Sequence, residues 1–254
     1  MTRAVSQLGA FLFRWRSYLP LILLPPIGMA IARFHQPGAS AASDYGWEIL
    51  SVTAALVGWL LRCYTVGVAA PGTSGRQTRS FKAESLNTTG PYSVVRHPLY
   101  LGNLVIAVAL SSFPRVWIVP PLVGLAAIAY YACIARREEE FLRQRFGDMF
   151  KRWAARVPMM IPAPGLWVPS DHRFDWRIPL RREYYALALV LILPVMMDAA
   201  EDFKGSGRIT FDPLWAPVAL LGAAAFLVCR ILKKRRRWRQ MSDGLHVTAR
   251  LHVS

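Results

Sequence analysis

Residues 47–70 read WEILSVTAALVGWLLRCYTVGVAA, an apolar run with one acid near its start and one arginine in its second half. A helix rises about 1.5 Å per residue, so roughly 20 residues cross the hydrocarbon core of a bilayer. In lipid the backbone must satisfy its own hydrogen bonds, which an uninterrupted helix does. This stretch therefore predicts a transmembrane helix.

Further apolar blocks repeat this pattern along the chain and cover residues 18–34, 99–113, 116–135, 184–197 and 215–232. The blocks at 99–113 and 184–197 are short for a span, so their ends must extend or the bilayer must thin locally. Only 18% of the residues are charged, whereas a soluble domain usually has about 25%. We therefore predict an all-α, polytopic membrane helix bundle of about six transmembrane helices.

The net charge of +16 is distributed unevenly between the connections. Basic residues precede the first block, fill residues 71–97 and 136–182, and form the tail run 233–237, whereas the connection 198–214 is acidic. Alternating basic connections follow the positive-inside rule and predict a multi-pass inner-membrane protein with both termini in the cytoplasm. Because topology accounts for the charge, no nucleic-acid partner is expected. The basic tail is instead expected to lie on anionic lipid headgroups, at about 1 kcal/mol per residue.

Two smaller features set limits on the chemistry and the processing of the chain. Cys63, Cys133 and Cys229 fall inside apolar blocks with no disulfide or metal spacing, so they predict small apolar fillers and no metal site. Two arginines before an apolar run that ends in Ala30-x-Ala32 are compatible with a cleaved signal peptide, although three prolines interrupt that run. Cleavage therefore stays open.

The polar residues that could carry chemistry lie in the two long basic connections. We divide the chain into N-terminal helices (1–70), a central core (71–165), and a C-terminal helix pair with a basic tail (166–254). In the second connection one apolar helix face spans an arc of about 100°. Its members are Leu142, Phe146, Met149, Phe150 and Trp153. This pattern predicts an amphipathic helix on the membrane or on the other helices.

Two acids begin this amphipathic segment and lie on its inner side. Glu139 is about 35° and Glu138 about 65° from the centre of the apolar arc, whereas Glu140 is about 135° away. A buried carboxylate is costly unless it meets a positive charge or donors. Glu139 can reach Arg143 one turn later, so a salt-bridged helix face and a ligand site explain the spacing equally well.

Residues 96–100, Arg-His-Pro-Leu-Tyr, stand where the first connection enters the third apolar block. Pro98 suits the first turn of a helix, where no N–H is needed. Taken singly, a snorkelling arginine, a capping histidine and an interfacial tyrosine explain the group. Together with Tyr92 and Gly102, the cluster is compatible with a small polar ligand at the membrane surface.

Residues 90–102 (GPYSVVRHPLYLG), Glu138-Glu139-x-x-Leu-x-x-x-Phe-Gly-x-x-Phe-x-x-Trp and Val157-Pro158-x-x-Ile-Pro resemble the isoprenylcysteine carboxyl methyltransferase and phospholipid methyltransferase superfamily. The resemblance covers about residues 71–162. It implies a methyltransferase whose cofactor, S-adenosylmethionine, sits in a cytoplasmic pocket closed by the amphipathic helix. The cofactor-binding residues it implies are Gln77, Asn87, Tyr92, His97, Pro98, Leu99, Tyr100, Gly102, Glu138 and Glu139. Carboxylates suit the cofactor's ammonium and hydroxyls, and aromatic rings suit adenine and the sulfonium.

The chain departs from the isoprenylcysteine type at one position. Such members usually carry an arginine for the substrate carboxylate four residues before the first acid, where this chain has Ile134. Arg136 or Arg137 could replace it, so Arg136 and Arg96 are the candidate catalytic residues for an anionic acceptor. Arg62 is expected to snorkel or, if buried, to meet an anionic headgroup.

The resemblance implies methylation of a membrane lipid or an isoprenoid-linked acceptor at the cytoplasmic leaflet, and the nearby arginines favour O-methylation of a carboxylate or phosphate. N-methylation of a phospholipid amine remains an alternative, as does a non-catalytic scaffold or sensor with the same fold. Transport is disfavoured because the predicted spans contain no mid-membrane acid. The sequence names neither the acceptor nor the oligomeric state.

Overall fold

The structure, a computed structural model, describes residues 41–70, 73, 85–209 and 211–251. The apolar block at 18–34 and the candidate cofactor residue Gln77 lie outside these residues. Within them the chain is helical and contains no strand. The elements are α3 (Ala41–Val68), α4 (Pro91–Val94), α5 (Pro98–Ser112), α6 (Val119–Arg156), the 3₁₀ turn η2 (Pro164–Leu166), α7 (Arg177–Arg182), α8 (Tyr184–Ser206) and α9 (Trp215–Leu251).

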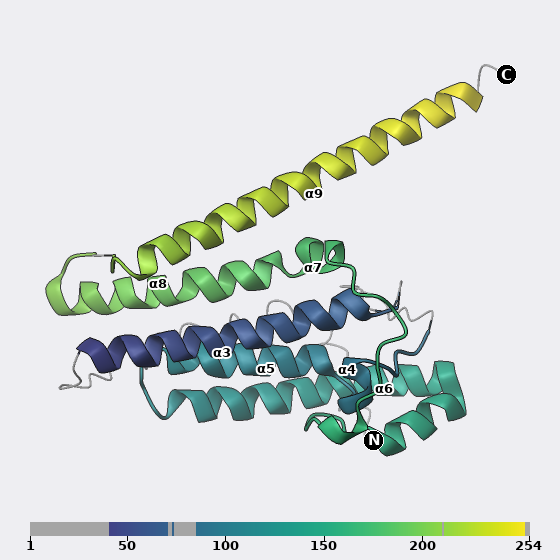
Figure 1. Cartoon of the computed structure of the whole chain (residues 1–254), viewed down its shortest axis with the longest axis horizontal. Coiled ribbons are helices and arrows are strands. Elements are labelled where there is room, and N and C mark those ends of the chain that lie inside the picture. Colours follow the sequence, from purple (N-terminus) through teal and green to yellow (C-terminus); the bar gives the residue numbers. More distant parts are fainter. Residues whose placement is uncertain (1–40, 71–72, 74–84, 210, 252–254) are drawn as a thin grey trace.

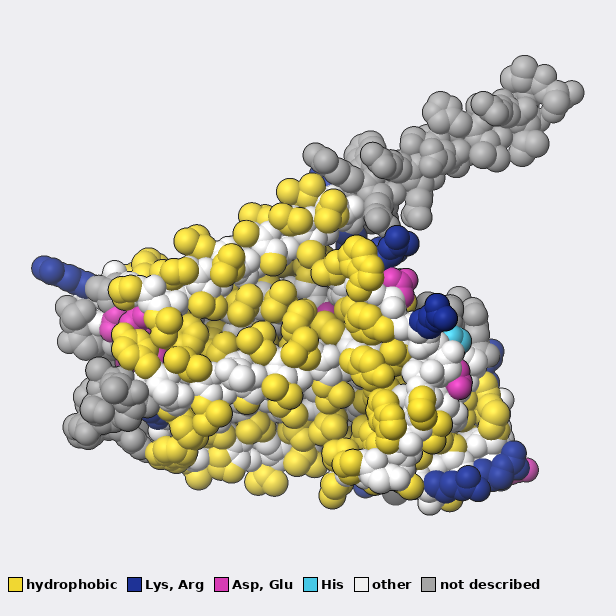
Figure 2. All heavy atoms as spheres, in the orientation of Figure 1, with side chains coloured by type: hydrophobic (Ala, Val, Ile, Leu, Met, Phe, Trp, Pro, Cys, Tyr) yellow, Lys and Arg dark blue, Asp and Glu magenta, His cyan; other side chains and the backbone are white. Residues whose placement is uncertain are grey.

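Every apolar block that falls in the described residues forms a helix. Three stretches are long and apolar enough to cross a membrane, namely Tyr45–Val68, Val119–Arg156 and Trp215–Lys234, and Pro98–Ser112 is a shorter apolar helix. Hydrophobic side chains cover the middle of the molecule, and charged side chains gather towards its two ends (Figure 2). This confirms the all-α membrane bundle.

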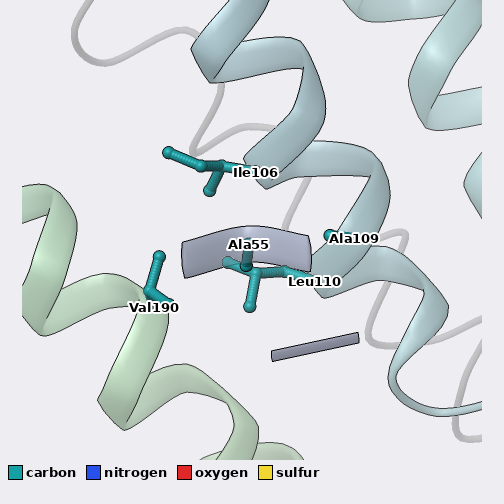
Figure 3. Packing of buried hydrophobic residues seen from close by; sticks show 5 residues of the cluster. All are labelled: Ala55, Ile106, Ala109, Leu110 and Val190. Atoms are coloured by element: carbon teal, nitrogen blue, oxygen red, sulfur yellow. The ribbon is translucent and has the colours of Figure 1, made fainter. Parts of the chain in front are cut away.

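The long helices lie side by side in the order α6, α5, α3, α8 and α9 (Figure 1). The core forms where α3, α5 and α8 meet, with Ala55, Ile106, Ala109, Leu110 and Val190 in contact (Figure 3). Because α3 is central, it joins α5 and α6 on one side to the C-terminal pair α8 and α9 on the other.

Small residues allow α3 and α5 to cross closely. A Cβ atom at Gly102 would lie 2.5 Å from Cγ of Arg62 and 2.9 Å from the Gly58 carbonyl oxygen, so no larger residue fits without movement. Close approach through small residues is the usual way for membrane helices to pack. Gly102 therefore serves the contact with α3, and its role in making room for a cofactor stays a prediction.

The sequence suggested that the amphipathic segment is a separate helix, but at its start it is not. It continues the fourth apolar block within α6, and the break comes at Gly147, whose φ of 53° and ψ of −123° are non-helical. A side chain at such angles is strained, which explains why glycine stands there. Beyond the break, Phe150 is fully buried and the Trp153 indole donates to the Tyr92 carbonyl oxygen at 3.1 Å.

After α6 the chain returns across α4 as a strap, which we define as residues 157–176. Backbone hydrogen bonds join Arg96 N–H to Pro158 O at 2.9 Å, Ala163 N–H to Val94 O at 2.9 Å and Gly90 N–H to Val168 O at 2.9 Å. These bonds hold the turn between α4 and α5, so the strap fixes the start of α5 from outside.

The opposite end of the bundle is acidic. The Tyr45 hydroxyl donates to Asp212 at 2.6 Å, and the Trp215 indole donates to Glu48 at 2.7 Å, so the start of α3 is fastened to the start of α9. Nearby, one carboxylate oxygen of Asp198 is buried without a hydrogen-bond partner among the described residues. Basic and acidic side chains thus mark different ends of the molecule.

Candidate functional site

The chain just before α5 faces the middle of α6 and brings an arginine, a histidine and a carboxylate together. Glu139 accepts a hydrogen bond from Arg96 at 2.9 Å and lies 3.0 Å from Nε2 of His97. Its side chain is 11% exposed, so the two partners offset the cost of burying the charge. Glu139 therefore pairs with Arg96 and His97 at the entry to α5, and the alternative partner Arg143 is exposed on the surface of α6.

Glu138 lies beside this pair but is less enclosed. The Tyr100 hydroxyl donates to its Oε2 at 2.9 Å, and Nδ1 of His97 lies 3.8 Å from the same oxygen. One third of the Glu138 side chain, 33%, remains exposed. The two neighbouring acids thus differ: Glu139 holds the protein together, and Glu138 offers a carboxylate to the outside.

Aromatic rings line the site next to Glu138. His97 stacks on Tyr100 with ring centroids 5.3 Å apart, and Tyr100 stacks on Tyr131 of α6 at 5.1 Å. Sequence reasoning missed Tyr131. Its signal was its position seven residues before Glu138, which is two turns away on the same face of a helix.

Arg62 of α3 is largely buried beside this region and does not extend to the lipid headgroups. Its guanidinium pairs with Glu183 at 2.7 Å, and the two side chains are 12% and 3% exposed. It also donates to the Asn103 side chain at 2.5 Å and to the Leu99 carbonyl oxygen at 3.3 Å. Glu183 could not be recognised as its partner from the sequence, because 121 residues separate the two.

Tyr92 approaches the same region from α4. Burial raises the pKa of its hydroxyl above the ordinary value of 10.0, and the negative charge of Glu138 raises it further, whereas Arg182 and Arg62 act in the opposite direction. The Tyr92 hydroxyl therefore stays protonated at neutral pH.

Other residues singled out in the sequence lie elsewhere or have different contacts. The Asn87 side chain accepts from Ala70 N–H at 3.0 Å and donates to Thr73 at 2.8 Å, so it fixes the connection after α3. Arg136 is exposed, and Arg137 pairs with Glu140 at 2.6 Å on the surface of α6. Pro98 is buried in the first turn of α5. The cofactor contacts of these residues stay predictions.

Comparison with known proteins agrees with the motifs and the fold. Residues 50–149 match the family described as phospholipid methyltransferase. The chain belongs to the isoprenylcysteine carboxyl methyltransferase and phospholipid methyltransferase superfamily of membrane proteins.

Three relatives show the range of names within this group. The chain is 31% identical to the nickel-cobalt-cadmium resistance protein NccN of Alcaligenes xylosoxydans, over 65% of this chain and 72% of the relative. It is 35% identical to the cobalt-zinc-cadmium resistance protein CzcN of Cupriavidus metallidurans, over 34% of this chain and 39% of the relative. It is also 35% identical to protein-S-isoprenylcysteine O-methyltransferase B of Arabidopsis thaliana, over 30% of this chain and 39% of the relative. No solved structure matches the chain significantly.

Proposed function

We propose that this membrane protein is an S-adenosylmethionine-dependent methyltransferase that modifies a lipid-like acceptor at the cytoplasmic leaflet of the inner membrane. The observation that carries the proposal is the meeting of the paired acids of α6 with Arg96 and His97, just before α5, and with Tyr100 in its first turn. The superfamily supports methyl transfer, and the basic character of this end of the bundle supports a cytoplasmic orientation.

The side chains of the site fit a zwitterionic, sulfonium-bearing cofactor. Glu138 offers a partly exposed carboxylate for an ammonium or hydroxyl, and the rings of Tyr100 and Tyr131 suit a cation or a purine. The Nε atom of Arg96 is buried and has no hydrogen-bond partner among the described residues. A buried donor without a partner costs about 1–3 kcal/mol, so a ligand oxygen bound here, such as the carboxylate of the cofactor, would remove that cost.

The bound cofactor supplies an activated methyl group on a positively charged sulfur. The protein then has to hold the acceptor in line with that methyl group and to keep water out, and alignment of this kind can contribute roughly 7–11 kcal/mol. The helix beyond Gly147 and the strap cover the turn before α5 and are suited to the second task. Glu139 binds both Arg96 and His97, which keeps the His97 ring against Tyr100.

Two acceptor classes have support from different side chains. A carboxylate or phosphate needs a cation to hold it. Arg62, Arg96 and Arg137 are already paired with carboxylates, so Arg136 at the surface is the arginine for O-methylation. A lipid amine needs a proton acceptor instead, and the partly exposed Glu138 beside His97 favours this second candidate.

Two relatives are named as metal-resistance proteins, but we propose no metal site in this chain. Within the described part of the chain, no three His, Cys, Asp or Glu side chains gather as a metal site requires. The basic run that begins at Lys233 is proposed to contact anionic lipid headgroups.

Calorimetry with purified protein in detergent tests the proposed cofactor site. The native chain is expected to bind S-adenosylmethionine, and Glu138→Gln and His97→Ala are each expected to weaken binding at least about tenfold, the loss of one charge-assisted hydrogen bond. Glu140→Gln is the matched control, because Glu140 adjoins the pair but is bonded to Arg137 at the surface. No binding by the native chain would refute the function, and unchanged binding by both site variants would refute the site.

Incubation of native membranes with methyl-labelled cofactor then separates the acceptors. Base-labile label that Arg136→Ala abolishes is expected for a carboxylate ester. Base-stable label on an amine headgroup would exclude the anionic acceptor and leave the amine.

A further inference from the structure

A continuous polar path runs from the C-terminal helix pair into the candidate site. Glu183, at the junction of α7 and α8, bonds to Nε of Arg62 at 2.8 Å. Arg62 bonds to Asn103, and the Asn103 side chain hydrogen-bonds the Tyr131 hydroxyl. The ring of Tyr131 stacks on Tyr100, which bonds to Glu138.

The guanidinium of Arg62 is held from three sides at once. Glu183 takes Nε and one terminal nitrogen, and the other terminal nitrogen bonds to the Leu99 carbonyl oxygen and the Asn103 side chain. A planar guanidinium fits such a fork, whereas the point charge of a lysine ammonium does not. Arg62 therefore has a single orientation, and this orientation depends on Glu183.

The backbone also places Glu183 firmly. Its N–H donates to the Pro179 carbonyl oxygen at 2.7 Å, and its own carbonyl accepts from Leu187 N–H at 3.0 Å and from the Trp59 indole at 3.1 Å. The residue is thus fixed both to α3 and to the two helices that it joins. A carboxylate held so rigidly can set the position of its partner.

We propose that Glu183 is a positioning residue for the methyltransferase site, and that through it the C-terminal helix pair completes the wall on which the cofactor rests. Glu183 orients Arg62, Arg62 orients Asn103 and the start of α5 at Leu99, and these hold Tyr131 and Tyr100 at the stacking distance. The inference rests on the proposed function and gives α8 and α9 a role in it that the superfamily motifs at residues 90–162 do not contain.

Two variants separate positioning from folding. Arg62→Lys keeps the charge pair with Glu183 but cannot reach three partners at once. The double variant Arg62→Met with Glu183→Leu removes both charges, leaves no unpaired ion, and keeps the net charge of the region. Replacing a buried ion pair by apolar residues of similar volume is often tolerated, so this variant is expected to fold. Glu140→Gln, which breaks the surface pair with Arg137, is the control.

The readouts are the unfolding temperature and the dissociation constant for S-adenosylmethionine, measured on the full chain in detergent. We expect native-like unfolding temperatures for the double variant and for the control, with affinity reduced about fivefold or more in Arg62→Lys and in the double variant and unchanged in the control. A stable double variant with native affinity would overturn the inference while leaving the proposed function intact. A native chain that binds no S-adenosylmethionine would overturn both.

Discussion

Glu138 and Glu139 are adjacent in the sequence and differ in what they can do. Glu139 has two partners just before α5 and is nearly buried, so its replacement would leave Arg96 as an unpaired charge. Glu138 has one tyrosine partner and an exposed flank. A loss of cofactor affinity on changing Glu138 therefore reports on binding, whereas the same loss on changing Glu139 reports also on folding.

The acidic end of the bundle contains a residue that makes stability depend on pH. Burial, together with the carboxylates of Asp202 and Asp212, raises the pKa of Asp198 from its ordinary 3.8 to about 6. The folded chain then binds a proton more tightly than the unfolded chain does. The resulting cost is complete above pH 6 and disappears as the pH falls towards 4.

Asp198→Asn is therefore expected to stabilise the protein at pH 7.5 by about 1 kcal/mol, after allowance for solvent screening, or about 2–4 °C in unfolding temperature. At pH 4 the same substitution should have little effect. Thermal unfolding in detergent at the two pH values measures the difference, with Asp148→Asn, an exposed acid at the other end of the bundle, as the control. A variant that is less stable at pH 7.5 would show that the ionised carboxylate is favourable there.

At the scale of single elements, the break in α6 decides whether the site is covered. Gly147 adopts a φ of 53°, and beyond it the chain turns back so that Trp153 reaches Tyr92. Gly147→Ala is expected to destabilise the protein by about 1–3 kcal/mol, because an L-residue is strained at these angles. Gly165→Ala is the control, since a Cβ at Gly165 meets nothing within 4 Å.

Denaturation with the two variants side by side measures this cost. Equal stability of Gly147→Ala and Gly165→Ala would mean that α6 can run straight through position 147. In that case the helix beyond the break would not be held against α4.

The helices could be predicted from the sequence because each apolar block that the structure describes is also a helix. The motif residues Arg96, His97 and Tyr100 could be matched with Glu138 and Glu139 because the superfamily pattern pairs the two segments. The break inside α6 was harder to predict, since glycine is common in helices of membrane proteins and its φ angle leaves no trace in hydropathy.

The pairing of Arg62 with Glu183 could not be predicted at all. Both residues lie at the ends of apolar blocks, where charged side chains usually reach for headgroups. Only the packing of α8 against α3 brings the two together. For the same reason the close approach of Arg62 to Gly102 could not be predicted.

At the scale of the whole molecule, charge separates the two ends of the bundle, and this separation predicts its orientation. In a chain whose three native cysteines are replaced by alanine, Glu201→Cys is expected to react with a membrane-impermeant maleimide in intact cells. Lys151→Cys, at the exposed surface beyond Gly147, should react only after permeabilisation. The opposite pattern would place the candidate site outside the cell and contradict the positive-inside orientation.

The helix pair α8 and α9 is attached to α3 at both ends of the bundle. Arg62 pairs with Glu183 at one end, and Trp215 bonds to Glu48 at the other. It thus braces the bundle, and any opening between α3 and this helix pair would have to break both contacts at the same time. A lipid-like acceptor that diffuses in the bilayer is therefore expected to arrive along the other flank, past the exposed Ile128 of α6.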